Sequence, residues 1–336
     1  MTTETLRADQ REPRRLDEGT IRNLGLVGVL VVLVIIGIIT RPELYSDPTW
    51  VRNNVLTILQ QASAIGVVTV GMTFVIIGGG IDLSVGAIIA LAGVWCTTVA
   101  TQSFGAAGMI FTAIMVGLGV GLVNGVLIAY GKLVPFIATL AMLVAARGLA
   151  AQISDKQTQI STNETINGIA TTRILGIPLL VIILAAVAAA GWVLLNRTTF
   201  GRRTVAVGGN EEAARLAGIN VKRQTLLLYM LSGLCCGIAA IMLTSQATSA
   251  QAGMANLYEL DAIAAAIIGG TLLSGGRGTI VGAIFGVLVF STITNLFAIN
   301  NLETEVQNMV KGGIIVAAVL IQQFRYQSLT QLFKKN

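Results

Sequence analysis

The stretch FVIIGGGIDLSVGAIIALAG, residues 74–93, places an aspartate inside a long apolar segment. Asp82 is the only charged residue between Arg52 and Lys132. A charged side chain in the middle of a membrane is costly, and such a residue usually pairs with another group, faces the protein interior or serves a function. The surrounding sequence should therefore either bury and hydrogen-bond this carboxylate or give it a function.

The composition of the chain is that of a membrane protein. Of its 336 residues, 54% are hydrophobic and only 11% are charged, and the mean hydropathy is +0.80. A soluble domain carries about 25% charged residues. Apolar runs long enough to cross the roughly 30 Å hydrocarbon core as helices recur along the whole chain, and they lack the alternating polarity of β-barrel strands. The sequence therefore predicts an all-α, polytopic membrane protein.

About ten transmembrane helices are expected from the apolar runs. The eighth is short, and it could be a re-entrant segment rather than a span. A polar segment over residues 153–177 and a polar, basic loop over residues 196–224 interrupt the series. The predicted helices cover residues 24–40, 55–77, 85–101, 107–130, 133–152, 178–195, 225–244, 259–273, 280–297 and 307–323.

The distribution of basic residues predicts the orientation. When the amino terminus is placed in the cytoplasm and the sides alternate, most of the 22 Lys and Arg residues fall on the cytoplasmic side, as the positive-inside rule requires. Both termini are then cytoplasmic, with tails over residues 1–22 and 325–336 around a transmembrane domain over residues 23–324. The net charge of +6 reflects this topology and does not require a nucleic-acid partner.

Several chemistries are excluded by what the sequence lacks. There is no histidine, and the three cysteines lie in apolar runs without a metal-binding spacing. The nearest approach to a phosphate-binding loop, AYGKLVPF (residues 129–136), has Leu133 where a serine or threonine is needed. No metal site, no cofactor and no enzymatic activity are therefore expected.

Glycine is abundant, with 38 residues in the chain. In GLGVGLVNG, Gly117, Gly121 and Gly125 recur at every fourth position and lie on one face of a helix. Small residues at this spacing allow two membrane helices to approach closely. We interpret these glycines as a packing ridge rather than a ligand site.

The segment GGIDLSVGAI, residues 79–88, aligns without gaps to GGRGTIVGAI, residues 275–284. Glycine-interrupted hydrophobic segments at matching positions in the two halves of a transporter indicate the translocation site. The alternative is a chance similarity in a glycine-rich chain. The predicted topology places both stretches on the same side of the membrane, whereas an inverted repeat would place them on opposite sides. The possible internal repeat therefore stays open.

Two roles are open for Asp82. Its carboxylate could accept hydrogen bonds from free backbone N–H groups at the start of the next helix, and Ser84 could cap the same helix. Alternatively, Asp82 and Ser84 line the translocation path or a gate. The neighbouring glycines indicate a turn and favour the cap.

Other polar residues in or beside the apolar runs are weaker candidates for the path. Gln60 and Asn124 lie inside predicted helices, where most polar side chains make interhelical hydrogen bonds. Glu259 and Asp261 lie at the start of the predicted eighth helix, where acidic residues also interact favourably with the helix dipole in water. Each of the four could therefore be structural instead.

The basic loop contains a short segment that has no use within a membrane. NEEAARLAGI predicts a helix with Asn210 as its N-cap and Gly218 as its stop. Its small alanines and paired acids argue against deep insertion into lipid, so docking onto a cytoplasmic partner is favoured over lying on anionic lipid. The candidate docking residues are Gly209, Asn210, Glu211, Glu212, Ala213, Ala214, Arg215, Leu216 and Gly218.

These motifs resemble the membrane permease subunit of bacterial ABC sugar importers of the ribose, xylose and galactose type. The resemblance rests on GGIDLSVG (79–86), FGRRTVAVGGNEEAARLAGI (200–219) and YELDAIAAAIIGGTLLSGGRGTIVGAIFG (258–286), which occur here in the family's order and spacing. Branched-chain amino acid permeases share the architecture, but their motifs are less similar to these.

The resemblance implies a location in the bacterial inner membrane and a set of partners. These are cytoplasmic ATP-binding subunits, an extracytoplasmic sugar-binding protein and a second permease copy or a paralogue. Residues 209–219 match the family's coupling helix, and segment 153–177 would receive the binding protein. ATP binding and hydrolysis in the partner would drive alternating access, and a monosaccharide or related small polyol would pass down the axis of the dimer.

Two alternatives are retained. A related importer could carry branched-chain amino acids or nucleosides. An ion-coupled secondary transporter would need ionisable groups in the middle of the membrane, and the sequence offers almost none besides Asp82.

Overall fold

The computed structural model describes residues 18–333. The predicted tail over residues 1–22 lies mostly outside this range, and so does the end of the tail predicted for residues 325–336. Within the range, α1 already begins at Glu18 and α15 continues to Phe333. Helical structure therefore extends past both predicted tail boundaries.

The described residues form an almost entirely helical structure. The helices are α1 (Glu18–Thr40), α2 (Pro42–Tyr45), α3 (Pro48–Ile77), α4 (Val85–Cys96), α5 (Val99–Gln102), α6 (Gly105–Ala129), α7 (Pro135–Ile153), α8 (Glu164–Gly168), α9 (Leu179–Arg197), α10 (Thr199–Gly209), α11 (Glu211–Leu216), α12 (Val221–Ala247), α13 (Tyr258–Ile268), α14 (Ile280–Ile299) and α15 (Thr304–Phe333). The strands are β1 (Gln159–Ile160), β2 (Arg173–Ile174), β3 (Ile177–Pro178) and β4 (Ser249–Ala250).

Seven of the described helices are long and apolar enough to cross a membrane, which confirms an all-α polytopic membrane protein. They cover Ile21–Thr40, Pro48–Ile77, Gly105–Ala129, Pro135–Ile153, Leu179–Arg197, Val221–Ala247 and Ile280–Ile299. Because every backbone polar group needs a partner within lipid, helices that satisfy their own N–H and C=O groups are the structures that such apolar segments adopt.

Two predicted spans are shorter in the structure than in the sequence interpretation. The third, predicted for residues 85–101, ends at Cys96, and the eighth, predicted for 259–273, ends at Ile268. At 1.5 Å per residue these helices measure about 18 Å and about 17 Å, which is less than the roughly 30 Å hydrocarbon core. Gly269 and Gly270 end α13, and Gly270 has φ +86°.

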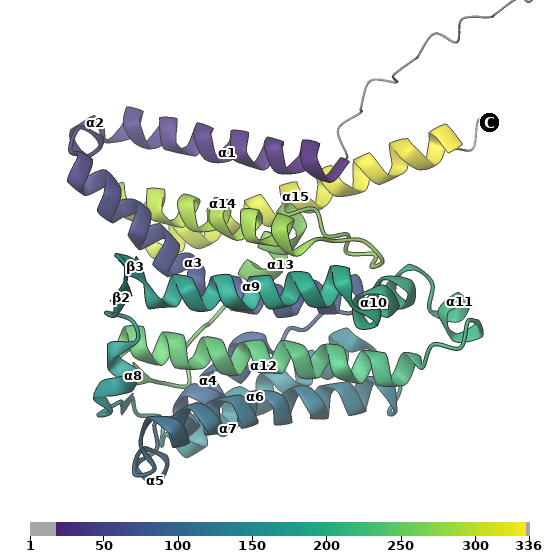
Figure 1. Cartoon of the computed structure of the whole chain (residues 1–336), viewed down its shortest axis with the longest axis horizontal. Helices are drawn as coiled ribbons and strands as arrows, with labels where there is room; N and C mark the ends of the chain where they lie inside the picture. Colours follow the sequence, from purple (N-terminus) through teal and green to yellow (C-terminus); the bar gives the residue numbers. More distant parts are fainter. Residues whose placement is uncertain (1–17, 334–336) are drawn as a thin grey trace, which may run out of the picture.

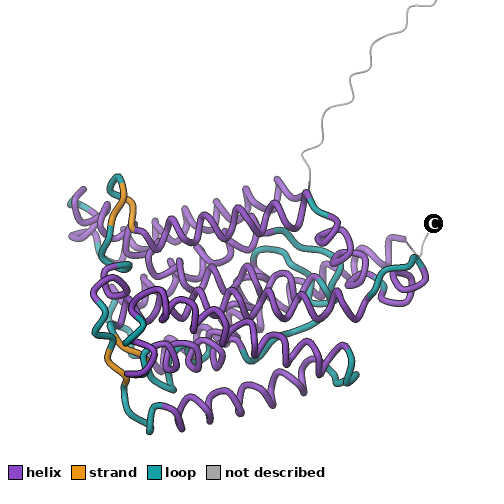
Figure 2. The backbone as a smooth tube through the Cα atoms, turned by 60° about the horizontal axis from the view of Figure 1, so that its bottom comes forward, coloured by secondary structure: helices purple, strands orange, loops and turns teal. Residues whose placement is uncertain are grey.

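The long helices lie side by side, with α1 along one edge of the bundle and α6 and α7 along the opposite edge (Figure 1). Helix α12 contacts α3, α4 and α6, so it occupies the middle of the packing. The two antiparallel strand pairs, β1 with β4 and β2 with β3, lie at one end of the bundle (Figure 2). We call this the strand end and the opposite end, which carries α11, the α11 end.

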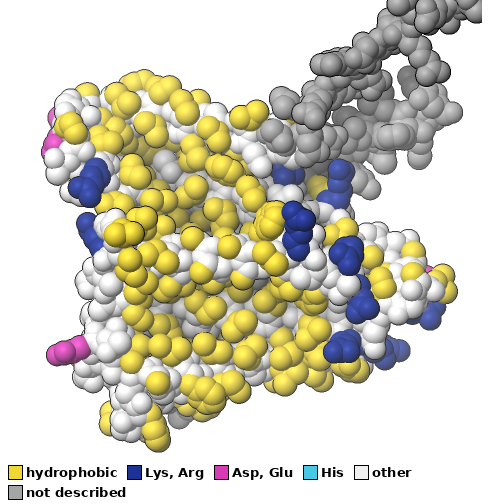
Figure 3. Space-filling model, in the orientation of Figure 1, with side chains coloured by type: hydrophobic (Ala, Val, Ile, Leu, Met, Phe, Trp, Pro, Cys, Tyr) yellow, Lys and Arg dark blue, Asp and Glu magenta, His cyan; other side chains and the backbone are white. Residues whose placement is uncertain are grey.

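Burial separates the central helices from the peripheral ones. Residues 62–77 of α3 are buried, and so is most of α4. Helices α1, α6 and α7 instead expose many large apolar side chains, as expected for surfaces that face lipid tails. Apolar side chains cover the middle of the face in Figure 3, and most of the visible Lys and Arg residues gather toward the α11 end.

The glycine ridge of α6 packs directly on α12. Gly117, Gly121 and Gly125 are buried. A Cβ atom at Gly117 would overlap the carbonyl oxygen of Gly233, and a Cβ at Gly121 would lie 3.0 Å from the Cα of Met230. The two backbones therefore meet without intervening side chains, as predicted from the spacing of the glycines.

Gly117→Val should lower the melting temperature and the folded yield of the detergent-purified protein. The added side chain must separate α6 from α12, and overpacking a tight interface costs about 1–3 kcal/mol. The matched control is Gly119→Val, because a Cβ at Gly119 meets nothing within 4 Å. Equal melting temperatures for the two variants would contradict the ridge.

Candidate functional site

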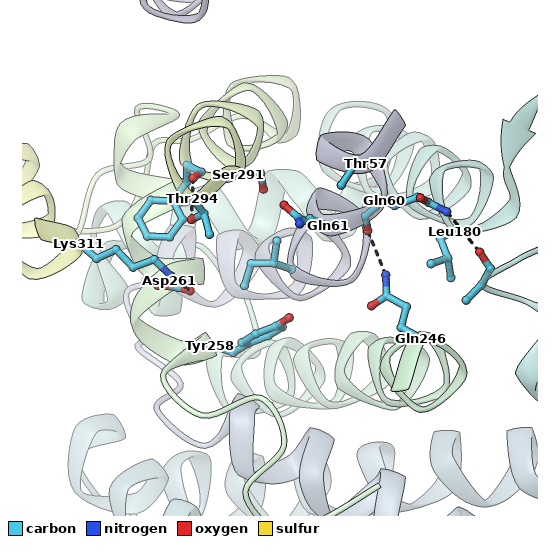
Figure 4. Close-up of a pocket in the computed structure, with 13 residues that line it drawn as sticks. Thr57, Gln60, Gln61, Leu180, Gln246, Tyr258, Asp261, Ser291, Thr294 and Lys311 are labelled. Carbon is cyan, nitrogen blue, oxygen red and sulfur yellow. Dashed lines mark hydrogen bonds and ion pairs between the residues drawn. The ribbon is translucent and has the colours of Figure 1, made fainter. Parts of the chain in front are cut away.

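A cavity of about 470 Å³ opens among the helices at the strand end. Its volume lies within the range of about 300–1,000 Å³ that is typical of small-molecule sites. The cavity is lined by Thr57, Gln60, Gln61, Ile65, Ala170, Leu180, Gln246, Tyr258, Asp261, Phe290, Ser291, Thr294 and Lys311. Figure 4 shows ten of these residues labelled around it.

Helix periodicity places the lining residues on shared faces. Four lining residues of α3 are spaced one, three or four positions apart and therefore lie on one side of that helix: Thr57, Gln60, Gln61 and Ile65. The same rule brings Tyr258 and Asp261 together at the first turn of α13 and joins Phe290, Ser291 and Thr294 on α14. Polar residues within otherwise apolar helices thus converge on one space.

The cavity contains an ion pair between two helices. Lys311 Nζ on α15 donates to Asp261 Oδ2 at 3.4 Å, and their side chains are only 19% and 17% exposed. The ammonium also lies 5.3 Å from the ring centroid of Phe290. Charged residues inside membrane proteins pair in this way because an isolated charge is costly in lipid. The pair therefore fixes α15 beside α13 at the wall of the cavity.

Glutamine side chains tie the rim of the cavity together. Gln60 Nε2 donates to the carbonyl oxygen of Ala170 at 3.3 Å, and Gln246 Nε2 donates to the backbone oxygen of Gln60 at 3.3 Å. Among the described residues, the amide of Gln61 and the hydroxyl of Tyr258 have no hydrogen-bond partner, and both border the cavity (Figure 4). The walls therefore present unused hydrogen-bonding groups next to aromatic faces.

Asp82 does not border this cavity but lies in a separate hydroxyl cluster, with none of its surface exposed. Its Oδ1 accepts hydrogen bonds from Ser84 N at 3.0 Å and from Ser84 Oγ at 2.6 Å, and its Oδ2 accepts one from Ser232 Oγ at 2.9 Å. Asn124 Nδ2 then donates to Ser84 Oγ at 2.9 Å. The shelter expected for the lone carboxylate is therefore built from α4, α6 and α12.

The cap expected at the start of α4 takes a different form. Asp82 bonds the N–H of Ser84, which precedes the helix, instead of a helical N–H group. Ser84 is the N-cap residue by position, but its side chain makes no capping hydrogen bond. The possible side-chain cap by Ser84 is therefore not formed: Ser84 already has helical backbone angles, and its hydroxyl accepts from Asn124 Nδ2 and donates to Asp82.

The predicted path residues thus separate into three places. Gln60 and Asp261 meet at the cavity, whereas Asp82, Ser84 and Asn124 form the buried cluster. Glu259 lines neither of them: its carboxylate lies against Gly86 of α4, and the residue is 7% exposed.

These sites also contain residues that the sequence did not indicate, among them Ser232, Tyr258 and Lys311. Ser232 and Tyr258 carry no local signal, because serine and tyrosine are common in membrane helices. Lys311 offered one: it is the only basic residue between Arg277 and Arg325, and it lies within an apolar run.

At the α11 end, the predicted docking helix has the caps that the sequence indicated. Asn210 Oδ1 accepts from Ala213 N at 2.9 Å, and Gly218 has φ +80° directly after the helix. Ala214 is buried against the bundle, whereas Leu216 is 75% exposed. Helix α10, which leads into α11, was not predicted, because its two threonines and three glycines conceal the helical pattern.

Two exposed charged residues of α11, Glu212 and Arg215, form an ion pair with each other. Arg215 Nε donates to Glu212 Oε2 at 3.0 Å. The hydrogen bond from Arg215 lowers the pKa of the Glu212 carboxyl, so Glu212 is ionised at neutral pH. An ion pair this exposed contributes little to stability. Exchanging it for contacts with a partner protein would therefore cost little.

Comparison with known proteins identifies the family. Residues 54–319 match the family described as branched-chain amino acid transport system / permease component. The ribose import permease protein of Bacillus subtilis is 41% identical over 96% of this chain and 99% of its own length. The ribose import permease protein of Escherichia coli K12 is 36% identical over 88% of this chain and 92% of its own. The L-arabinose ABC transporter permease protein of Azospirillum brasilense is 35% identical over 91% and 88%.

No solved structure gives a significant match to the chain. The family match covers well over half of the residues, and the similarity to the named permeases extends along nearly the whole chain. The chain therefore belongs to the permease components of ABC transport systems, and it is a multi-pass protein of the inner membrane.

Proposed function

We propose that this permease forms the membrane path of an ATP-driven importer that moves a monosaccharide or a related small polyol by alternating access. The chain is a permease of a sugar ABC importer, as its relatives named for ribose, galactofuranose and L-arabinose support. The cavity at the strand end is the structural observation that carries the proposal.

The chemistry of the cavity suits a neutral, polyhydroxylated molecule. Sugar hydroxyls both donate and accept, and the amides and hydroxyls of Gln61, Ser291 and Tyr258 do the same. Aromatic rings supply apolar surface for the faces of a sugar ring. The one full charge pair, Asp261 with Lys311, neutralises itself. We propose that Gln60 and Asp261 belong to the sugar path through this cavity.

We propose that the α11 end faces the cytoplasm. The Lys and Arg residues that gather there follow the positive-inside rule (Figure 3). The strand end, including residues 153–177, then faces outward and receives the sugar-binding protein. In this arrangement both termini are cytoplasmic, and α4 and α13 complete two of ten crossings together with the glycine-containing segments 78–84 and 269–279.

We propose that α11 docks onto a cytoplasmic ATP-binding subunit. The exposure of Leu216, Glu211 and Glu212 on a rigidly capped helix supports this role. The docking residues would be Gly209, Asn210, Glu211, Glu212, Ala213, Ala214, Arg215, Leu216 and Gly218. Two permease subunits, as two copies or as a copy with a paralogue, would form the complete membrane unit.

Two alternatives are weaker. A branched-chain amino acid would need partners for its ammonium and carboxylate groups, and in the cavity Asp261 and Lys311 already bond each other. An ion-coupled transporter would need an ionisable group free to bind the coupling ion, but Asp261 at the cavity is paired with Lys311, and Asp82 is fully buried and holds three hydrogen bonds. We propose that Asp82, Ser84 and Asn124 anchor the break before α4 rather than contact the sugar.

The docking proposal predicts that Glu212→Arg combined with Leu216→Asp abolishes copurification of the ATP-binding subunit. Both changes place unfavourable charges in the interface, and truncating such central contacts costs about 2 kcal/mol or more. The matched control combines Glu164→Arg with Leu175→Asp at the strand end, where Leu175 is 98% exposed. An intact complex in the first variant would contradict docking through α11.

The cavity proposal predicts that Gln61→Leu and Tyr258→Leu each lower ATP-driven sugar uptake by up to about tenfold, because each removes a hydrogen bond worth about 0.5–1.5 kcal/mol. Copurification with the ATP-binding subunit should stay unchanged. Asn53→Leu is the control, since Asn53 lies on α3 outside the cavity and is exposed. Wild-type uptake by both cavity variants would exclude this route.

The anchoring role predicts different effects of two Asp82 substitutions. Asp82→Asn keeps an acceptor for Ser84 and should leave the melting temperature in nanodiscs and sugar uptake near wild type. Asp82→Ala removes the acceptor for the buried Ser84 N–H and should lower the free energy of unfolding by about 1–3 kcal/mol. Lost uptake in a fully stable Asp82→Asn variant would instead place the charge in the path.

A further inference from the structure

Three glycine-containing segments that are far apart in the sequence meet at the α11 end. They are residues 77–80 after α3, residues 208–209 at the end of α10 and residues 275–276 in the loop between α13 and α14. Gly276 N donates a hydrogen bond to the carbonyl oxygen of Ile77 at 2.8 Å. We call this meeting point the glycine junction.

The junction is packed backbone against backbone. A Cβ atom at Gly208 would overlap the carbonyl oxygen of Ile77 and lie 2.8 Å from Gly276 N. A Cβ at Gly275 would lie 2.7 Å from the carbonyl oxygen of Gly208 and 3.0 Å from the Cα of Gly79. No other amino acid fits at Gly208 or Gly275 unless the backbone moves.

Both membrane breaks also adopt the same unusual conformation at the junction. Gly79 and Gly275 occupy equivalent positions in the two similar segments, and their φ angles are +86° and +84°. Side chains disfavour this left-handed region, whereas glycine adopts it freely. The shared conformation lets each break turn at the point where Gly208 touches it.

The junction connects three parts of the permease that the proposed cycle must move together. Residues 78–84 lead into α4 through the Asp82 cluster, and residues 269–279 begin where α13 ends. The first turn of α13 carries Asp261 and Tyr258 at the cavity. Gly208 lies two residues before Asn210, the N-cap of α11.

We propose that Gly208 is a positioning residue that transmits movement of α11 to the two breaks, and through them to α4 and α13. Close-packed contacts have few soft directions, so a displacement at one backbone must displace its neighbours. Because Gly208 has no side chain, the backbones touch directly, and no flexible side chain lies between them to absorb the movement. This inference rests on the proposed docking of α11 to the ATP-binding subunit.

The test compares Gly208 with a glycine outside the junction, in the full complex. Gly208→Ala should retain copurification of the ATP-binding subunit and ATP hydrolysis, but sugar uptake should fall by about tenfold, since coupling changes of up to about 2 kcal/mol are typical of such positions. Gly148→Ala on α7, away from the junction, the cavity and α11, should match the wild type in all three measurements, because a Cβ at Gly148 meets nothing within 4 Å. Wild-type uptake per ATP hydrolysed in Gly208→Ala would overturn the proposal.

A second measurement needs no substitution at the junction. In the unsubstituted complex, hydrogen exchange of peptides covering residues 77–84 and 270–280 should change when a non-hydrolysable ATP analogue is added, together with residues 205–218. A response confined to residues 205–218 would overturn transmission but leave docking intact. A complex that survives Glu212→Arg with Leu216→Asp would refute docking itself, so the two failures are distinguishable.

Discussion

The architecture depends on how a helical chain can be interrupted inside a membrane. An interrupted helix leaves backbone N–H and C=O groups without partners, and lipid offers none. Here one interruption supplies partners for the other: Gly276 N, in the loop after α13, donates to the carbonyl oxygen of Ile77 at the end of α3. The close approach of the backbones leaves no room for a Cβ atom at Gly208, Gly275 or Gly276, which accounts for glycine at these positions.

Asp82 and Asp261 find partners inside the bundle in two different ways. Asp82 accepts hydrogen bonds from the backbone and hydroxyl of Ser84, directly before α4, and from the hydroxyl of Ser232 on α12, and its side chain is fully buried. Asp261 instead pairs with Lys311 at the edge of a cavity, and this pair retains limited exposure. The first arrangement stabilises a turn, and the second leaves a polar surface that a sugar can reach. Asp82 and Asp261, which are both acidic residues in or beside apolar runs, thus have different roles.

Much of the fold could be predicted because the determining patterns are local. Apolar runs placed the helices, and Asn210 with Gly218 bounded α11 correctly. The shortening of α4 and α13, the ion pair of Asp261 with Lys311 and the bond from Ser232 to Asp82 could not be predicted in this way. The ion pair and the Ser232 bond join residues 50 and 150 positions apart, for which one sequence carries no pattern. For the same reason the sequence indicated Gln60 and Asp261 separately and did not predict that they line one cavity.

The proposed function is the passage of a sugar through this permease, driven by ATP hydrolysis in a partner subunit. Its most direct test is uptake of radiolabelled pentose into proteoliposomes that contain the permease, its ATP-binding subunit and its sugar-binding protein. Uptake should require ATP and the binding protein and should continue when proton and sodium gradients are collapsed. Uptake driven by an ion gradient without ATP would contradict it.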